Sequence, residues 1–196
     1  MMEKDAIQRL QRNLGITADG VLGLGTYQSL FSKFSAQSER CSELALAANV
    51  HFKRYGIEEN SLRFKHFMAQ VLHESGSFRY MEEIASGSAY EGRKDLGNVC
   101  KGDGCRYKGR GPIQLTGRNN YKVFGQALGF DFERHPEMVA FPSIGLLVAC
   151  KFWSDHGLNT LADQNKIELI TRRINGGLNG FEDRKMLFEK VSRMFN

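Results

Sequence analysis

The sequence predicts a mainly α-helical protein with a small helical module at its N-terminus. Of its 196 residues, 41% are hydrophobic, which is enough for one full domain and a small appendage. Apolar residues recur at three- and four-residue spacing in most segments, which is the period of a buried helix face. Residues 85–118 differ, because they are glycine-rich and irregular, with room only for a short hairpin. Functional residues are expected in such a long loop.

Residues 1–37 predict the N-terminal module. A helix over residues 4–14 ends at Gly15, Asp19 and Gly20 form a turn, and a second helix covers residues 24–34. This pattern resembles the small peptidoglycan-binding domain that precedes many wall hydrolases. Modules of this size rarely fold alone, so we expect it either to dock on residues 38–196, with weak glycan binding, or simply to cap their core. Three side chains could serve as packing residues or as glycan contacts: Leu22, Leu24 and Tyr27.

Residues 38–196 predict a helical domain. We expect helices over residues 40–55, 61–75, 119–128, 143–155, 165–174 and 181–194. In the helix over 61–75, Ser61 offers an N-cap and Phe67 belongs to an apolar stripe. Glu74 falls in the last turn beside that stripe, where partial desolvation and the negative helix end disfavour its charged form. Glu74 therefore suits a general acid, with an ordinary solvated glutamate as the alternative.

Glu83 follows Glu74 by nine residues, and the pair needs a break in the helix. On a continuous helix the two carboxylates would point in opposite directions, about 13.5 Å apart along the axis. Ser75, Gly76 and Ser77 are good helix terminators, so we expect the chain to turn there and bring Glu83 back towards Glu74.

Downstream motifs supply further polar groups. Residues 112–116 alternate like a half-buried strand, so the Thr116 hydroxyl either satisfies local backbone or faces a ligand. Asn175 caps the helix over 165–174. Arg184 lies near the apolar stripe of the last helix, where an inward carboxylate partner is expected because an unpaired buried charge is costly.

Together, these motifs resemble glycoside hydrolase family nineteen. The resemblance rests on residues 73–76, Glu83, residues 109–121, and residues 174–177 with Asp183 and Arg184, and it covers roughly residues 40–196. Within the family, the match is to bacteriophage lysozymes, the endolysins, rather than to plant chitinases. The resemblance implies the two-lobed lysozyme-superfamily fold, with the glycine-rich loop or short hairpin lining a cleft.

The resemblance also implies residue roles. Glu74 would donate a proton to the leaving oxygen, Glu83 would act as general base, and Thr116 would help to hold the attacking water. Arg184 would lie near Glu83 and keep it ionised. The candidate substrate-binding residues are His73, Tyr107, Gln114, Asn120, Asn175 and Arg184. Two other acids, Glu82 and Glu91, are alternatives for the second carboxylate, with Glu83 ranked first.

The implied activity is hydrolysis of the β-1,4 bond between N-acetylmuramic acid and N-acetylglucosamine in bacterial peptidoglycan. An inverting general acid and general base mechanism would carry it, and host cell lysis would follow. A chitinase and a lytic transglycosylase, which works with one carboxylate, are the enzymatic alternatives. A wall-binding protein without catalytic activity is the non-enzymatic alternative. The expected partner is peptidoglycan and the expected state is a monomer.

Composition limits the possible binding partners and the expected location of the protein. The net charge of +5 suits a polyanion, but the basic residues are dispersed and no nucleic-acid motif occurs, so a wall polymer fits better. No segment is apolar enough to span a bilayer, and no signal peptide is visible, so we expect the host cytoplasm until release to the periplasm or wall. No cofactor or metal is expected. The cysteines, Cys41, Cys100, Cys105 and Cys150, are too few for a disulfide-built fold. Free thiols are expected, with a small oxidised loop between Cys100 and Cys105 as the alternative.

Overall fold

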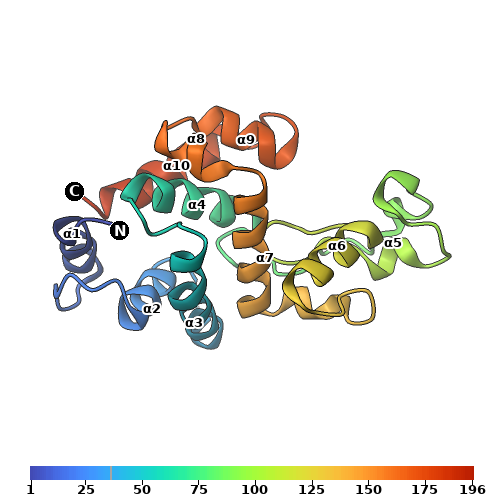
Figure 1. Cartoon of the computed structure of the whole chain (residues 1–196), viewed down its shortest axis with the longest axis horizontal. Helices are drawn as coiled ribbons and strands as arrows, with labels where there is room; N and C mark the ends of the chain where they lie inside the picture. Colours follow the sequence, from blue (N-terminus) through green and yellow to red (C-terminus); the bar gives the residue numbers. More distant parts are fainter. Residues whose placement is uncertain (36) are drawn as a thin grey trace.

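The structure, a computed structural model that describes residues 1–35 and 37–196, is mainly helical and has two lobes (Figure 1). The helices are α1 (Lys4–Leu14), α2 (Leu24–Ser32), α3 (Ser38–Arg54), α4 (Ser61–Glu74), α5 (Asp103–Arg106), α6 (Arg118–Leu128), α7 (Pro142–Asp155), α8 (Leu158–Asp163), α9 (Ile167–Asn175) and α10 (Phe181–Arg193). Three short 3-10 helices are η1 (Ser88–Tyr90), η2 (Lys94–Leu96) and η3 (Pro136–Ala140). The predicted fold class is confirmed.

The larger lobe is built around α4. This helix packs against α10 and α8, and its Phe64 and Phe67 lie in a core that also contains Phe52 of α3 and Trp153 of α7. The rings of Phe67 and Trp153 meet edge to face with centroids 5.4 Å apart, a favourable aromatic geometry. Asn60, rather than the predicted Ser61, caps α4 by accepting a hydrogen bond from the backbone N–H of Arg63 at 2.9 Å. The core thus fixes the helix that ends at Glu74.

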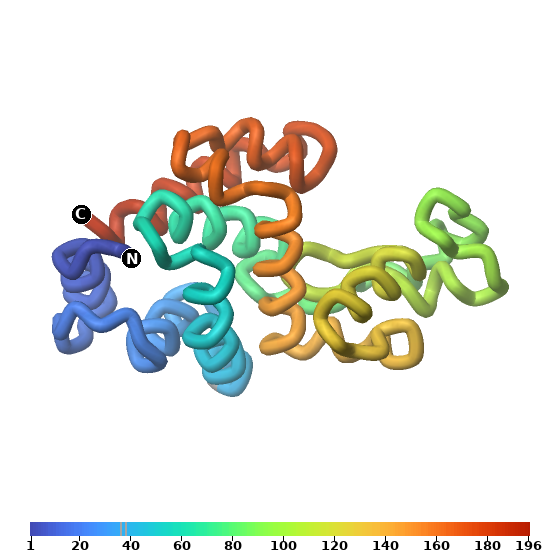
Figure 2. The backbone as a smooth tube through the Cα atoms, viewed as in Figure 1, coloured from blue at the N-terminus to red at the C-terminus, as the bar shows by residue number. Residues whose placement is uncertain are grey.

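The smaller lobe has its own hydrophobic core and joins the larger one through α7. The chain enters this lobe after α4 and returns through α7, as the tube in Figure 2 shows. Its buried members are Tyr107, Leu115, Tyr121, Phe124, Phe132, Val139 and Val148. Val148 of α7 belongs to this core, whereas Cys150 and Trp153 of the same helix belong to the larger one. Because α7 contributes to both cores, it sets the relative position of the two lobes.

The N-terminal segment does not have a separate core. Leu10 of α1 and both Tyr27 and Phe31 of α2 are fully buried in the core of the larger lobe. The Tyr27 hydroxyl donates to Glu58 Oε2 at 2.6 Å, and the Phe31 ring meets Phe78 edge to face at 5.3 Å. The boundary drawn after residue 37 therefore does not separate two cores, and Tyr27 is a packing residue. Glycan binding by this segment stays a prediction.

The predicted helices are confirmed with small shifts at their ends. The structure differs from the prediction in two short helices and in one strand. The short helices α5 and α8 were not predicted, because four and six residues carry too little periodicity to be recognised. The half-buried strand expected over residues 112–116 is wrong. In the described residues, only isolated antiparallel bridges join Glu82 to Arg110 and Arg110 to Leu115. Residues 111–114 form the turn between Arg110 and Leu115.

Candidate active site

Glu74 is the last residue of α4, and a left-handed turn ends the helix directly after it. Gly76, Ser77 and Phe78 have φ values of 55°, 60° and 61°, a region that is costly for residues other than glycine. The Ser75 hydroxyl stabilises the turn, because it donates to the Val71 carbonyl at 2.6 Å and accepts from the Phe78 N–H at 2.8 Å. The fully buried Phe78 ring anchors it. The helix break expected at Gly76 is confirmed.

Arg184 of α10 holds the Glu74 carboxylate. Its Nη2 donates to Glu74 Oε1, and its Nη1 donates to Gln70 Oε1 at 2.5 Å. The Arg184 side chain is only 2% exposed, and the backbone carbonyl of Asn179 accepts from its Nε at 3.3 Å. The expected inward carboxylate partner is therefore present. Its assignment is corrected, since Arg184 pairs with Glu74 at the end of α4 and not with Glu83.

The residues next to this ion pair form a second contact of the same kind. His73 Nδ1 lies 2.5 Å from Asp183 Oδ2, so two neighbours on α4 pair with two neighbours on α10. A Cβ on Gly180 would lie 2.2 Å from His73 Cε1, so only glycine allows the imidazole to approach the loop so closely. Asn175 organises that loop by donating to the Asn179 carbonyl at 3.0 Å and accepting from the Gly177 N–H at 2.8 Å. Asn175 and Arg184 thus share the Asn179 carbonyl, and His73 is fixed to α10 beside the ion pair of Arg184 with Glu74.

The Glu83 carboxylate is held by the backbone and a phenol, whereas the nearby cation, Lys108, donates to the Glu83 main-chain carbonyl at 3.0 Å. Its own N–H donates to the Gly109 carbonyl at 2.8 Å, and its Oε2 accepts from the Gly109 N–H at 3.1 Å. The Tyr90 hydroxyl donates to Glu83 Oε1 at 3.1 Å. Partial burial, and then this hydrogen bond, raises the pKa of Tyr90, so the phenol keeps the proton that it donates. Glu83 therefore accepts a hydrogen bond at each of its two carboxylate oxygens.

Thr116 and Gln114 lie on the same side of Gly109 as Glu83. A Cβ on Gly109 would lie 2.6 Å from Gln114 Oε1 and 3.3 Å from both Glu83 Oε2 and Thr116 Oγ1. The turn brings Gln114 there with a φ of 54°, and the Thr116 hydroxyl donates to the Gln114 carbonyl at 2.8 Å. The exposed Asn120 is linked to this group through its Nδ2, which donates to the Thr116 carbonyl at 2.8 Å. Three predicted site residues, Glu83, Gln114 and Thr116, therefore meet around one glycine, and Asn120 is attached to Thr116.

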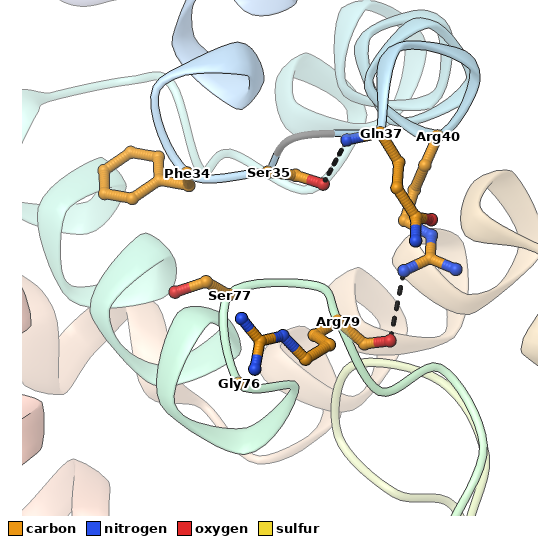
Figure 3. Close-up of a pocket in the computed structure, with 7 residues that line it drawn as sticks. All are labelled: Phe34, Ser35, Gln37, Arg40, Gly76, Ser77 and Arg79. Atoms are coloured by element: carbon orange, nitrogen blue, oxygen red, sulfur yellow. Dashed lines mark hydrogen bonds between the residues drawn. The ribbon is translucent and has the colours of Figure 1, made fainter.

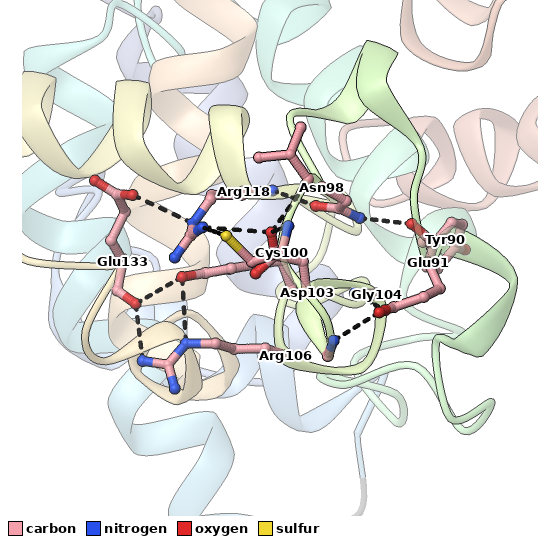
Figure 4. Close-up of polar contacts among 12 residues, drawn as sticks. Tyr90, Glu91, Asn98, Cys100, Asp103, Gly104, Arg106, Arg118 and Glu133 are labelled. Atoms are coloured by element: carbon pink, nitrogen blue, oxygen red, sulfur yellow. Dashed lines mark hydrogen bonds and ion pairs between the residues drawn. The ribbon is translucent and has the colours of Figure 1, made fainter.

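Glu91 and Glu82, the alternatives to Glu83, have other partners. Both Glu91 oxygens accept backbone hydrogen bonds, from Gly102 at 2.6 Å and from Gly104 at 2.8 Å (Figure 4). They satisfy amides at the start of α5, which is a structural task. Glu82 is an ion-pair partner of Arg110 at 2.9 Å and of Lys108 at 3.4 Å. Of the three acids, Glu83 is the one that lies beside Thr116 and Gln114.

Tyr107 is the predicted substrate contact that the structure contradicts. Its side chain is buried in the core of the smaller lobe, and its hydroxyl donates to the Glu133 carbonyl at 3.0 Å. The guanidinium of Arg118 lies 5.3 Å from the ring centroid. Because ring and hydroxyl are both used internally, Tyr107 supports the loop and does not face a ligand.

Two residues of the site escaped the sequence analysis. Gln70 lies one helical turn before Glu74, so its position on the same face of α4 was a usable signal for a shared partner. Tyr90 had no such signal, because it reaches Glu83 from an irregular loop. In residues 1–35 and 37–196, no group of three or more potential metal-ligating side chains is present. Over the same residues, no helix is long and apolar enough to cross a membrane.

Residues 66–168, which include Glu74, Glu83, Gln114 and Thr116, match the model of the family described as Chitinase class I, glycoside hydrolase family 19. A glycosyl hydrolase family 19 domain-containing protein of Haemophilus influenzae is 34% identical over 164 residues, which are 67% of this chain and 80% of that protein. The chain belongs to glycoside hydrolase family 19. It is a chitinase-like glycoside hydrolase.

Plant and bacterial chitinases are similar to it as well. An endochitinase of Arabidopsis thaliana is 40% identical over 111 residues, 56% of this chain, but the match spans only 38% of the plant protein. The class IV chitinase from Zea mays superposes with a TM-score of 0.64 at 20% identity, covering 89% of this chain and 92% of that one. Chitinase C from Streptomyces griseus gives a TM-score of 0.58 at 20% identity, covering 98% and 91%. These two likenesses confirm the fold.

Proposed function

We propose that this family 19 protein is an endolysin that hydrolyses the β-1,4 bond between N-acetylmuramic acid and N-acetylglucosamine in peptidoglycan, with inversion. The observation that carries the proposal is the pair of differently held carboxyls. Glu74 is fixed by a buried arginine at a helix end, and Glu83 is fixed by a backbone amide beside the Thr116 hydroxyl. Two carboxyl groups with separate roles are what inverting hydrolysis requires.

In this mechanism Glu74 takes up a proton on the oxygen that Arg184 does not contact and donates it to the leaving glycosidic oxygen, and the Arg184 guanidinium then stabilises the carboxylate that is left. Glu83 accepts a proton from a water on the opposite face of the sugar, and the Thr116 hydroxyl positions that water. The water oxygen bonds to the anomeric carbon as the glycosidic bond breaks, so no covalent enzyme intermediate forms. Gln114, Asn120, Asn175 and His73 are assigned to sugar binding, and Arg184 orients Glu74.

Single substitutions test these roles on purified peptidoglycan. Glu74→Gln and Glu83→Gln are each expected to lower kcat by about 10²–10⁴-fold, the usual contribution of a general acid or base. Glu82→Gln and Glu91→Gln are the matched controls and should retain most activity. If Glu91→Gln or Glu82→Gln abolished hydrolysis while Glu83→Gln did not, the base would be reassigned. If Glu74→Gln remained fully lytic, the enzymatic interpretation of this site would fail.

Product analysis tests the reaction type. Proton NMR of the first products should show the α-anomer, because inversion at a β-linkage gives that configuration. Mass spectrometry should show reducing ends that have gained water. Anhydro ends would instead identify a lytic transglycosylase.

A chitinase is the second candidate, and it has support from the relative in Arabidopsis thaliana, which is called an endochitinase. The two polymers share the β-1,4 linkage and differ mainly in the lactyl group of muramic acid, so the same carboxyls would serve both. Parallel assays with purified peptidoglycan and chitin oligomers separate the candidates. Faster cleavage of the chitin oligomers would overturn the peptidoglycan assignment.

The biological setting is part of the same proposal. A monomeric endolysin would remain in the host cytoplasm until it is released to the wall. The N-terminal segment would then add contacts to the wall glycan through its exposed side, where Leu24 is 41% and Val21 is 63% exposed. Binding of Leu24→Ala and Val21→Ala variants to insoluble peptidoglycan tests that contribution.

A further inference from the structure

A polar pocket lies on the turn that follows Glu74. It has a volume of about 210 Å³ and is formed by the connection between α2 and α3 together with the loop after α4. Figure 3 shows its lining residues, which are Phe34, Ser35, Gln37, Arg40, Gly76, Ser77 and Arg79. Two of these lining residues, Gly76 and Ser77, have the left-handed backbone conformation of the turn that follows α4. The pocket is therefore attached to the segment that joins Glu74 to Glu83.

The pocket is positively charged. Arg40 and Arg79 are its charged lining residues, and among the residues that the structure describes no acidic side chain lines it. Arg40 donates from Nη1 to the carbonyls of Phe78 at 2.5 Å and Arg79 at 3.1 Å. Within residues 1–35 and 37–196, its Nε and Nη2 have no hydrogen bond and can donate to a ligand. The Arg79 guanidinium has no hydrogen bond or ion pair within residues 1–35 and 37–196, and Figure 3 shows it turned back towards Gly76 and Ser77.

The N-terminus of α3 adds to this charge. Gln37 is its N-cap and contributes no side-chain hydrogen bond to the first turn. The 17-residue helix thus directs the positive end of its dipole to the side of the pocket that Gln37 and Arg40 line. Two guanidinium groups, a helix N-terminus and the Ser35 and Ser77 hydroxyls together favour an anion with several acceptor oxygens.

The size of the pocket restricts the anion. Its volume is below the range of about 300–1,000 Å³ that holds a whole drug-sized ligand, so it accommodates an end group. Arginine binds planar carboxylates through paired N–H donors. In peptidoglycan the stem peptides carry carboxylates, whereas the sugar chain of chitin carries none. We propose that this pocket binds a carboxylate of the peptidoglycan stem peptide through Arg79 and Arg40.

This assignment rests on the proposed function and adds a preference for peptide-bearing glycan. Arg79→Gln removes the charge of the free guanidinium and leaves Arg40 to hold the turn. Arg12→Gln is the matched control, because Arg12 is an exposed arginine on α1 outside the pocket. Arg79→Lys keeps the charge without the paired donors and should recover part of the effect.

The experiment compares intact peptidoglycan with the same glycan after an amidase has removed its stem peptides and the lactyl carboxylates that this hydrolysis exposes have been converted to amides. For the wild type, kcat/KM should be higher on the intact polymer, chiefly through a lower KM. In Arg79→Gln the ratio of intact to stripped kcat/KM should fall by about tenfold, the usual effect of losing a hydrogen bond to a charged group. Arg12→Gln should keep the wild-type ratio. Thermal unfolding of each variant verifies that it is folded.

The outcomes separate this inference from the proposed function. A wild type that cleaves both polymers equally, or an Arg79→Gln ratio equal to that of the wild type, overturns the carboxylate site alone. An equal loss by Arg79→Gln on both polymers also overturns it, because the arginine would then act on the common glycan. A wild type that cleaves chitin oligomers but neither peptidoglycan sample refutes the proposed function and this assignment with it.

Discussion

Glu74 and Glu83 are held in opposite ways. Around Glu74 the contacts come from side chains on α4 and α10, and the central arginine is almost completely buried. Around Glu83 they come from the Gly109 amide, a tight turn and one phenol on a loop. Packing therefore fixes the first carboxyl, whereas backbone geometry fixes the second. The contacts of Glu74, the Glu74 side, and those of Glu83, the Glu83 side, should therefore respond differently to substitution.

Arg184→Gln is expected to have the largest effect. Removing one partner of a buried ion pair leaves the other without compensation and usually costs about 3–5 kcal/mol of unfolding free energy. Chemical denaturation should show that loss, and activity should fall with it because Glu74 is no longer oriented. Arg172→Gln is the control, since its pair with Glu168 is exposed on both sides and should contribute less than about 1 kcal/mol. Equal losses in both variants would contradict a packed Glu74 side.

His66 makes the stability of the same helix depend on pH. Burial lowers the pKa of His66 from 6.5 to about 4, although its hydrogen bond to Asn165 acts in the opposite direction. Below pH 6.5 the unfolded chain therefore binds a proton that the folded chain does not take up until about pH 4. The unfolding free energy should fall across that window, by up to about 3 kcal/mol.

Urea unfolding at intervals from pH 7 to pH 4 measures this effect. His66→Gln should be less stable at pH 7 and show a flatter pH dependence, most clearly between pH 6.5 and 5, where few carboxylates titrate. His135→Gln is the control because that imidazole is on the surface. An unchanged slope in His66→Gln would show that this buried histidine is not the source.

The Glu74 side of the site was partly predictable from the sequence. The helix that carries Glu74 was predictable, because apolar residues such as Phe64 and Phe67 repeat with its period and Gly76 marks its end. The need for a carboxylate partner of Arg184 followed from the cost of burying a charge. Which acid it would meet did not follow, since that depends on how α10 packs against α4.

The Glu83 side was less predictable for a physical reason. Residues 112–116 alternate like a strand, but Gly111 and Gln114 adopt positive φ values and turn the chain back on itself. Glycine signals that freedom, whereas glutamine does not. The approach of Tyr90 and the burial of Tyr107 both depend on loop contacts with no periodic signal. The family resemblance therefore identified Glu83, Gln114 and Thr116 on this side, without Tyr90 and without the geometry of the group.

Gly109→Ala should disturb the Glu83 side with little effect on stability. Gly109 does not have a positive φ, so alanine fits its backbone, but the new Cβ would lie 2.6 Å from Gln114 Oε1. Gln114, and with it Thr116 and Glu83, would have to shift. A displacement of this kind near the chemistry can cost about 100-fold in kcat/KM. Gly25→Ala is the control, because its Cβ would meet nothing within 4 Å. Wild-type activity in Gly109→Ala would show that this cluster does not position the reacting groups.

Tyr90→Phe should have the smallest effect and isolates one contact of Glu83. The substitution removes the hydroxyl that donates to Glu83 Oε1 and leaves the Gly109 amide on Oε2. With one of two hydrogen bonds kept, we expect a loss of about 1 kcal/mol of transition-state stabilisation, or about fivefold in kcat/KM. The loss should appear in kcat more than in KM, because the hydroxyl acts on Glu83 rather than on the sugar. In an Arg184→Gln background the same substitution should cost an equal factor, since the two carboxyls are held by separate contacts. A Tyr90→Phe effect that disappears in that background would instead mean that the two sides are coupled.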